Sequence, residues 1–245
     1  MLAYKGFNKD LICTLGKGQY QYEIGKTFKE SKAKCVAAGL HCAEYPADCF
    51  TYYPIGNGNR YFLVEAGGHI DEDARDSKIA CTEMTLLQEL TIQDMMYATI
   101  EYLFAHPHRP FEHRSEGVVV AKDEAKLTKN GGFCIAFGKD PRVMATVDNG
   151  MMVLLTADDN GEVAGAKLLK VGVNGVKKNT WYTNAKEWTK KVVKPSAHTM
   201  GADTCVTCGE PIPEGRHVCP NCEAKYEKEN DREPAIQKSR RRKAD

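Results

Sequence analysis

The clearest hydrophobic pattern in the chain lies over residues 91–104. Apolar side chains recur there at i, i+3 and i+4, which places them on one face of a helix. Thr91 and Asp94 stand at the positions of a capping box, in which two side chains of the first turn each accept a hydrogen bond from a free backbone N–H. The pattern therefore predicts a core helix from Thr91 to Phe104.

Shorter patterns on either side predict a compact α+β unit over residues 1–115. Residues 2–7 and 61–66 are typical of strands. Residues 29–38 are rich in alanine and lysine and are followed by Gly39, which predicts a helix with a glycine C-cap. A second, short helix is expected to begin at Pro46, with an apolar face formed by Cys49, Phe50 and Tyr53.

Residues 116–191 predict a β-rich unit, either a meander or a small stacked sheet. Two Asp-Asn-Gly sequences, at residues 148–150 and 159–161, lie between apolar runs, and this pattern favours hairpin turns. The runs expected to form strands are residues 118–121, 133–137, 143–147, 151–156 and 163–171.

Two polar segments complete the expected organisation. Residues 192–204 have no periodicity and are predicted to be a linker, and residues 223–245 form a charged tail whose first part can extend as a helix. The tail is either a solubilising end or a contact for nucleic acid or another acidic surface. Its positive charges are concentrated on Lys238, Arg240, Arg241, Arg242 and Lys243.

The charge balance argues against a partner recruited by the electrostatic field of the whole protein. Lys plus Arg number 34 and Asp plus Glu number 33, so the chain as a whole does not attract nucleic acid or an anionic membrane. No apolar stretch approaches the roughly 18 residues of a membrane span, and the first residues do not resemble a signal peptide. We therefore expect a cytoplasmic protein with no membrane partner.

Cysteines near the C-terminus have the spacing of a metal site. Cys205 and Cys208 form one Cys-x-x-Cys knuckle, and Cys219 and Cys222 form a second after ten residues. Four thiolates leave no open position for water, so the pattern predicts a zinc ribbon over residues 205–222 that holds a structural Zn²⁺. A pair of redox motifs is the alternative, although such motifs are usually single and lie beside a βαβ pattern.

The ribbon is too short to fold on apolar burial, so metal binding should supply its folding energy. Chelation is expected to unfold it and leave the rest of the protein intact.

Other potential metal ligands are expected to be structural. Residues 106–114 contain three histidines and two prolines in a spacing that fits no familiar metal site, so we expect a solvated basic loop there. The remaining cysteines are expected to behave as small hydrophobes, because most lie within apolar patterns of a chain with a substantial core. They are Cys13, Cys35, Cys42, Cys49, Cys81 and Cys134.

Several sequence blocks resemble an uncharacterised family of proteins encoded by phages and prophages. The blocks are Ala3-Tyr-Lys-Gly-Phe-Asn-Lys-Asp10, Tyr22-Glu-Ile-Gly-Lys-Thr-Phe28, Gly39-Leu-His-Cys-Ala-Glu44, Pro46-Ala-Asp-Cys-Phe50 with Tyr52-Tyr53, and Asn179-Thr-Trp-Tyr182. The resemblance spans most of residues 1–185 and implies a phage accessory role. Members of this family often carry short solenoid-like repeats in the middle, whereas the strands predicted here do not repeat in sequence.

The N-terminal unit also resembles the layout of ADP-ribosyltransferase folds. A strand with Tyr-x-Gly is followed by Gly-x-His, a helix with two tyrosines and a strand containing a glutamate. The resemblance implies that Lys5 and Tyr53 hold a nicotinamide dinucleotide and that Glu65 stabilises the transition state. Lys5 departs from the arginine or histidine of that family, and lysine lacks their planar donor groups.

Further candidate site residues lie in the same unit. His41 is either an acid or base in a cleft or a hydrogen-bonded histidine at a loop corner. Glu44, Asp48 and Glu65 are either a carboxylate cluster or separate solvated and capping residues.

Three functions follow from these patterns. The leading hypothesis is a phage or prophage accessory protein that binds a host macromolecule, with counter-defence as one such role. The alternatives are an ADP-ribosyltransferase-like enzyme and a structural virion protein. A cleft lined by all four of Lys5, His41, Tyr53 and Glu65 would favour the enzyme.

Overall fold

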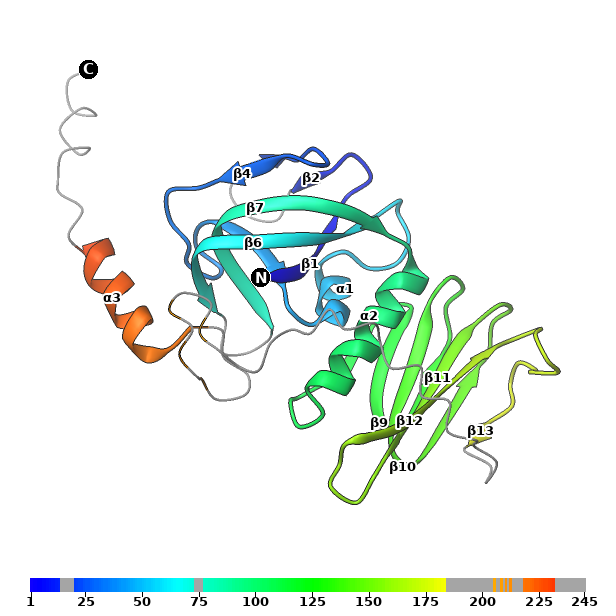
Figure 1. Ribbon diagram of the computed structural model, residues 1–245. Coiled ribbons are helices and arrows are strands. Elements are labelled where there is room, and N and C mark those ends of the chain that lie inside the picture. Colours follow the sequence, from blue (N-terminus) through cyan, green and yellow to red (C-terminus); the bar gives the residue numbers. More distant parts are fainter. Residues whose placement is uncertain are drawn as a thin grey trace.

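The computed structural model describes residues 1–13, 20–72, 77–183 and 218–231, together with Cys205, Cys208, Glu210 and Ile212. Within these residues the protein is rich in strands and has few helices, as Figure 1 shows. No helix in this part of the chain is long and apolar enough to cross a membrane. The predicted linker at residues 192–204 and the basic cluster at residues 238–243 lie outside the described residues.

The N-terminal strands close into a small barrel. β1 pairs with β5 and β6, β6 pairs with β7, and β7 pairs back to β5, so four strands form a ring. β4 pairs with residues 83–85 of β7, beyond the stretch that pairs with β5, and β2 (Ile12–Cys13) with β3 (Tyr20–Gln21) forms a separate small sheet. The barrel strands are β1 (Leu2–Phe7), β4 (Thr27–Lys29), β5 (Leu40–Ala43), β6 (Arg60–Glu72) and β7 (Lys78–Leu90).

The predicted strand at residues 2–7 is confirmed as β1, and that at residues 61–66 is confirmed as part of β6. The sequence patterns did not predict β7. Both β6 and β7 have 13 residues, and their pairing is interrupted twice, between Leu63 and Val64 and between Gly67 and Ile70. Such irregularities bend a strand and so allow the ring to close.

Two short helical segments and one long helix pack beside the barrel. The helix expected at Pro46 is confirmed as the 3₁₀ segment η1 (Pro46–Asp48) followed by α1 (Cys49–Tyr52). The long helix is confirmed as α2 (Ile92–Ala105). Its N-cap Thr91 accepts a hydrogen bond from the Asp94 backbone N–H, and the Asp94 side chain accepts one from that of Thr91.

The prediction of a helix over residues 29–38 was wrong. This segment starts at the last residue of β4 and continues into a tight turn in which Lys34 bridges to Ala38, and Val36 has φ +68°. Tertiary contacts outweigh the alanine-rich composition. The Cys35 backbone N–H donates to the Asp71 carboxylate at 2.6 Å, and a helix would have used that donor internally.

The middle of the chain forms a short coil of parallel strands. β9 pairs in parallel with β10, and β10 pairs in parallel with β11, so that Val118, Phe133 and Met151 lie in register. β8 and β12 close the two ends of this sheet as antiparallel strands. The strands are β8 (His113–Ser115), β9 (Val118–Leu127), β10 (Phe133–Ala145), β11 (Met151–Ala157), β12 (Val163–Lys170) and β13 (Tyr182–Thr183).

β9 and β10 must fold over on themselves. A straight strand of the length of β9 extends about 30 Å, and the five residues 128–132 cannot lead the chain back to the start of β10 over that distance. Asp123, with φ +59°, marks the corner in β9, and the register of β10 shifts between Phe137 and Arg142. The first halves of the strands therefore form one layer, and the second halves form another.

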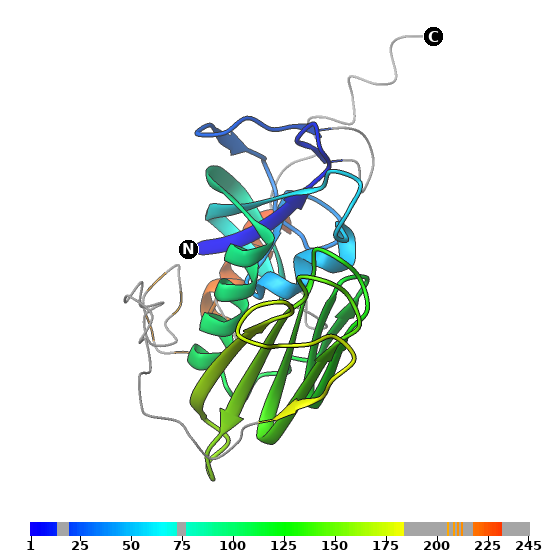
Figure 2. The ribbon, with the colours of Figure 1, turned by 90° about the vertical axis from the view of Figure 1, so that its right-hand side faces the viewer.

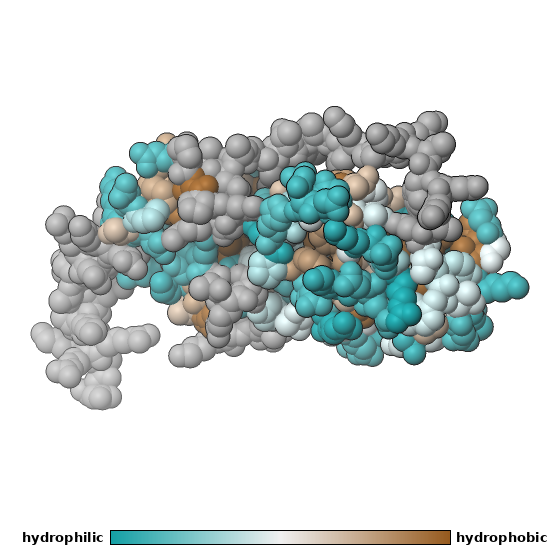
Figure 3. Space-filling model, turned by 90° about the horizontal axis from the view of Figure 1, so that it is seen from below, coloured by the Kyte–Doolittle hydropathy of each residue, from teal (hydrophilic) through white to brown (hydrophobic). Residues whose placement is uncertain are grey.

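The first layer buries both of its faces. Val118, Phe133 and Ile135 on its outer face share a hydrophobic core with η1, α1 and α2, and Cys134 and Met152 on the other face pack against the second layer. α2 consequently lies between the barrel and the coil, as both ribbon views show (Figures 1 and 2). From below, the surface is mostly hydrophilic, with hydrophobic residues visible in small areas (Figure 3).

The hairpin predictions for the middle were half right. The sequence at residues 159–161 does connect the antiparallel strands β11 and β12. The sequence at residues 148–150 instead leads from β10 to its parallel neighbour β11, so the unit is stacked and is not a meander. Neighbouring coils match in backbone register without repeating in sequence, which explains why the repeat was not recognised.

Candidate functional site

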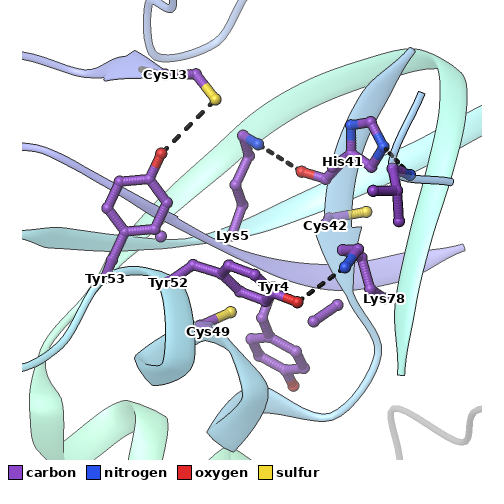
Figure 4. Close-up of a pocket in the computed structure, with 12 residues that line it drawn as sticks. Tyr4, Lys5, Cys13, His41, Cys42, Cys49, Tyr52, Tyr53 and Lys78 are labelled. Carbon is purple, nitrogen blue, oxygen red and sulfur yellow. Dashed lines mark hydrogen bonds between the residues drawn. The ribbon is translucent and has the colours of Figure 1, made fainter. Parts of the chain in front are cut away.

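A pocket of about 270 Å³ opens between the barrel and the short helix α1. Its lining comes from β1, β5, α1, the residue after α1, the start of β7 and the turn at Val36. Three of the four residues proposed from the sequence line it, namely Lys5, His41 and Tyr53 (Figure 4). This shared location makes the pocket the main candidate for a functional site.

Lys5 is the deepest charged group in the pocket. Alternation along β1 places it on the same side as Ala3 and Phe7, and only 5% of the residue is exposed. Its ammonium group donates to the His41 carbonyl and lies 5.2 and 5.3 Å from the ring centroids of Phe7 and Tyr22. Among the described residues, no carboxylate forms an ion pair with Lys5.

A second lysine stands nearer to solvent. Lys78 at the start of β7 donates to the Tyr52 hydroxyl at 2.8 Å and lies 4.8 Å from the centre of that ring. None of the described residues that line the pocket is a carboxylate. The described lining of the pocket therefore combines two lysine side chains with tyrosine rings and includes no negative side chain.

His41 helps to hold the turn beside the pocket. Its Nε2 accepts a hydrogen bond from the Val36 backbone N–H at 3.1 Å, so this nitrogen carries no proton. Burial lowers the pKa of His41, and the neighbouring charges of Lys5 and Lys78 lower it further. A neutral ring that accepts from the backbone fits the structural alternative for His41 better than an acid or base role.

Tyr53 is positioned by a glycine. A Cβ atom on Gly6 would lie 2.7 Å from Cδ2 of Tyr53, so the ring can pack against β1 only because residue 6 has no side chain. The Tyr53 hydroxyl lies 3.6 Å from Sγ of Cys13. The backbone carbonyl of Tyr53 accepts a hydrogen bond from the Tyr61 hydroxyl at 2.7 Å.

The cysteines around the pocket provide apolar wall. Cys13, Cys42 and Cys49 line it. Burial raises the pKa of the Cys49 thiol to about 12 and raises that of Cys42 well above its usual range. The pKa of Cys81, which accepts a hydrogen bond from Cys42, is lowered, but Cys81 is completely buried. Cys42 and Cys49 therefore stay protonated, as small hydrophobic groups.

The structure places the candidate carboxylates in separate positions. Glu65 is exposed on β6, between Val64 and Ala66, whose side chains enter the barrel core. Glu44 pairs with Arg109, and Asp48 accepts hydrogen bonds from Ser77. Glu65 therefore does not join the other three candidates in the pocket.

The histidine-containing loop was predicted to be solvated, and this holds only in part: two of its histidines are buried, whereas the exposed residues are His108, Pro110, Glu112 and Arg114. His106 and His113 are only 7% and 6% exposed, because the loop packs between the barrel and the coil. His113 Nε2 lies 2.9 Å from the Ser115 hydroxyl, and its Nδ1 lies 3.6 Å from Asp48. Arg109 donates to the Tyr102 hydroxyl at 2.9 Å, in addition to its pairing with Glu44. These polar contacts fix how the two units pack.

The four C-terminal cysteines meet at one point. The Sγ atoms of Cys205, Cys208, Cys219 and Cys222 all lie within 4.8 Å of one another, and those of Cys208 and Cys219 are 3.6 Å apart. Tetrahedral zinc–thiolate bonds of about 2.3 Å require sulfur–sulfur distances of about 3.8 Å. The cluster has the size and donor set to bind a metal ion.

The segment that carries these four cysteines packs on the barrel. Cys205, Ile212, Val218 and Cys219 are buried and belong to the same hydrophobic cluster as the barrel core. The Val218 backbone N–H donates to the Glu72 carboxylate at the end of β6 at 2.9 Å. α3 (Pro220–Asp231) continues from the last knuckle, as predicted for the start of the tail.

Comparison with known families gave a match, which lies in the N-terminal part of the chain. Residues 1–98 match the model of an uncharacterised family described as Domain of unknown function (DUF7666). The match covers the barrel, the pocket and the first turns of α2. No curated protein and no solved structure matched the chain.

Proposed function

We propose that this is a phage or prophage accessory protein that acts in the host cytoplasm by binding a host macromolecule at the Lys5 pocket. The observation that carries the proposal is a buried lysine in an open pocket, with no carboxylate partner among the residues that the structure describes. The resemblance of several sequence blocks to phage and prophage proteins supports the biological setting, including a counter-defence role.

The energetic argument concerns the ammonium group of Lys5. Removing a charge from water costs several kcal/mol unless an opposite charge or hydrogen bonds replace the lost hydration. Within the described residues, Lys5 has one carbonyl acceptor and two aromatic rings but no anion. A negatively charged group on a partner would supply the missing counter-charge.

Binding without turnover is favoured over ADP-ribosyl transfer. That reaction needs a carboxylate beside the bound dinucleotide, and Glu65 is exposed away from the pocket. The remaining candidates, Lys5 and Tyr53, can contact a ligand but offer no negative charge to stabilise an oxocarbenium-like transition state.

The test is affinity capture from host cells with three versions of the full chain. We expect the wild type and Glu65→Gln to retain the same host component and Lys5→Met to lose it. An enzyme would instead lose product formation in Glu65→Gln. Equal capture by wild type and Lys5→Met would refute binding through the pocket.

We also propose that the four-cysteine cluster holds a structural Zn²⁺. The all-sulfur donor set and the Sγ separations support zinc, and four protein ligands leave no position for a substrate. Elemental analysis of the purified protein should give about one zinc per chain, as expected for a single four-thiolate site. Protein that folds fully without bound metal would disprove this assignment.

A further inference from the structure

We infer that the Lys5 pocket recognises an aromatic anion, namely one aromatic ring that bears a phosphate or a carboxylate. The inference rests on the proposed function and names the chemistry of the group that enters the pocket. That group is either part of the host macromolecule or a free small molecule, and the experiment below separates these two sources.

The walls of the pocket call for an apolar, flat body. Tyr52 and Tyr53 contribute rings, and Val36 and Ala43 contribute aliphatic surface. The thiols of Cys42 and Cys49 are neutral, because burial raises their pKa. A fully hydrated ion such as inorganic phosphate would leave this surface unfilled, whereas an aromatic ring can pack against the tyrosines.

The charged end of the ligand is defined by the two lysines. Lys5 lies deep and extends from β1 toward the His41 carbonyl on β5, and Lys78 stands closer to solvent beside Tyr52 (Figure 4). An ammonium group attracts a carboxylate or a phosphate as a point charge and does not require the two-pronged geometry of an arginine. Both anions therefore belong to the same ligand class.

The volume limits the size of the ligand. Small-molecule pockets usually measure about 300–1,000 Å³. At about 270 Å³ the pocket lies just below that range, which suits one ring with one anionic group. A nicotinamide dinucleotide, which the enzyme alternative requires, has two rings and two phosphates and is too large to be enclosed.

The experiment measures calorimetric binding of four probes to the full chain, namely phenyl phosphate, benzoate, inorganic phosphate and phenol. We expect at least one of the two aromatic anions to bind about tenfold or more tightly than inorganic phosphate and phenol, as one charged contact is worth that much. Lys5→Met should weaken this binding by a similar factor. The matched control is Lys29→Met, which removes an exposed lysine of β4 that pairs with Glu83 of β7.

Thermal unfolding separates a binding role of Lys5 from a structural one. If Lys5 serves the ligand, Lys5→Met should unfold at the same or a higher temperature and lose the upward shift caused by the aromatic anion. Should that variant fail to fold, Lys78→Met provides the second test, with the same expected loss of affinity. The inference is overturned if none of the probes binds, if phenol binds as well as phenyl phosphate, or if the folded lysine variants bind like wild type.

A competition step distinguishes the two sources of the ligand. Displacement of the captured host component by the bound aromatic anion shows that the macromolecule carries the group. Binding of the anion without displacement, or without any captured component, shows a free small molecule and contradicts the proposed function while supporting the inference. If capture depends on Lys5 but none of the probes binds, the result supports the proposed function and contradicts the inference of an aromatic anion.

Discussion

His41 shows how a residue can belong to a pocket and still serve the backbone around it. Its ring accepts a hydrogen bond from Val36, a residue in the left-handed conformation, and so stabilises a turn that no helix or sheet supports. Two lysines close to the ring disfavour its protonation. The charge that makes the pocket attractive to anions therefore also keeps His41 neutral.

This coupling predicts a pH dependence of stability. The pKa of His41 is lowered by burial and by the lysines, so between that value and the unfolded pKa of about 6.5 the unfolded chain binds more protons. The free energy of unfolding should be constant above about pH 6.5 and should fall as the pH drops below it. Urea unfolding at several pH values would measure this change.

His41→Gln should remove much of the decrease between neutral pH and the folded pKa, because glutamine does not titrate. The pKa of Asp48 is also lowered, since hydrogen bonds from His113 and Ser77 outweigh the opposing effect of burial. Its contribution is lost only below about pH 4, in a separate window. An unchanged pH profile in His41→Gln would show that another group is responsible.

At the scale of elements, the spacing between the parallel strands of the coil depends on glycines in the turns that precede these strands. Gly117, Gly132 and Gly150 immediately precede β9, β10 and β11. A Cβ atom on Gly132 would lie 1.9 Å from the Gly117 carbonyl oxygen, which accepts a hydrogen bond from the Phe133 N–H at 3.0 Å. The turn before β10 therefore has no room for a side chain on residue 132.

Gly132→Ala should destabilise the protein by about 1–3 kcal/mol or more, since overpacking against backbone is not easily relieved. The control is Gly165→Ala on β12, where a Cβ atom would meet nothing within 4 Å. Chemical denaturation of both variants would show the difference. Equal free energies of unfolding would mean that the turn at Gly132 can widen without destabilising the protein.

At the scale of the whole molecule, the four-cysteine segment connects the C-terminal part of the chain to the N-terminal barrel. Its buried residues share a core with the barrel, and Val218 hydrogen-bonds to Glu72. The sequence suggested a separate module that could unfold alone. Because these contacts cross to the barrel, loss of the metal should be felt there as well.

Chelation should therefore lower the thermal unfolding temperature and increase hydrogen exchange near the Glu72 end of β6 as well as in α3. The control is a Cys205→Ser, Cys208→Ser double variant, whose unfolding should not change further on chelation. Increased exchange confined to α3 would favour the original expectation of an independent ribbon.

Elements with strong local patterns were predictable, and those set by distant contacts were not. The capping box of Thr91 and the apolar periodicity after it define α2 from neighbouring residues alone. The segment around Cys35 was mistaken for a helix, because its conformation depends on Asp71, 36 residues away. β7 was missed, although it contacts three other barrel strands.

The site was predicted in part for a similar reason. Lys5, His41 and Tyr53 were chosen for their chemistry and local order, and the ring of strands then places them together. Glu65 lies on a predicted strand, but its side was not known before the register of β6 was known. Lys78 was not identified, because the start of β7 carries no local signal of a pocket.

The two edge strands of the coil determine whether further chains can add to its sheet. Parallel strands in register can in principle add further copies without limit, as fibrils do. Here one end is closed by β8, which has only three residues, and the other by β12, which carries Lys167 and Lys170. Short and lysine-bearing edge strands resist pairing with another chain. The sheet of one chain should therefore not extend by pairing with the sheet of another chain at either edge.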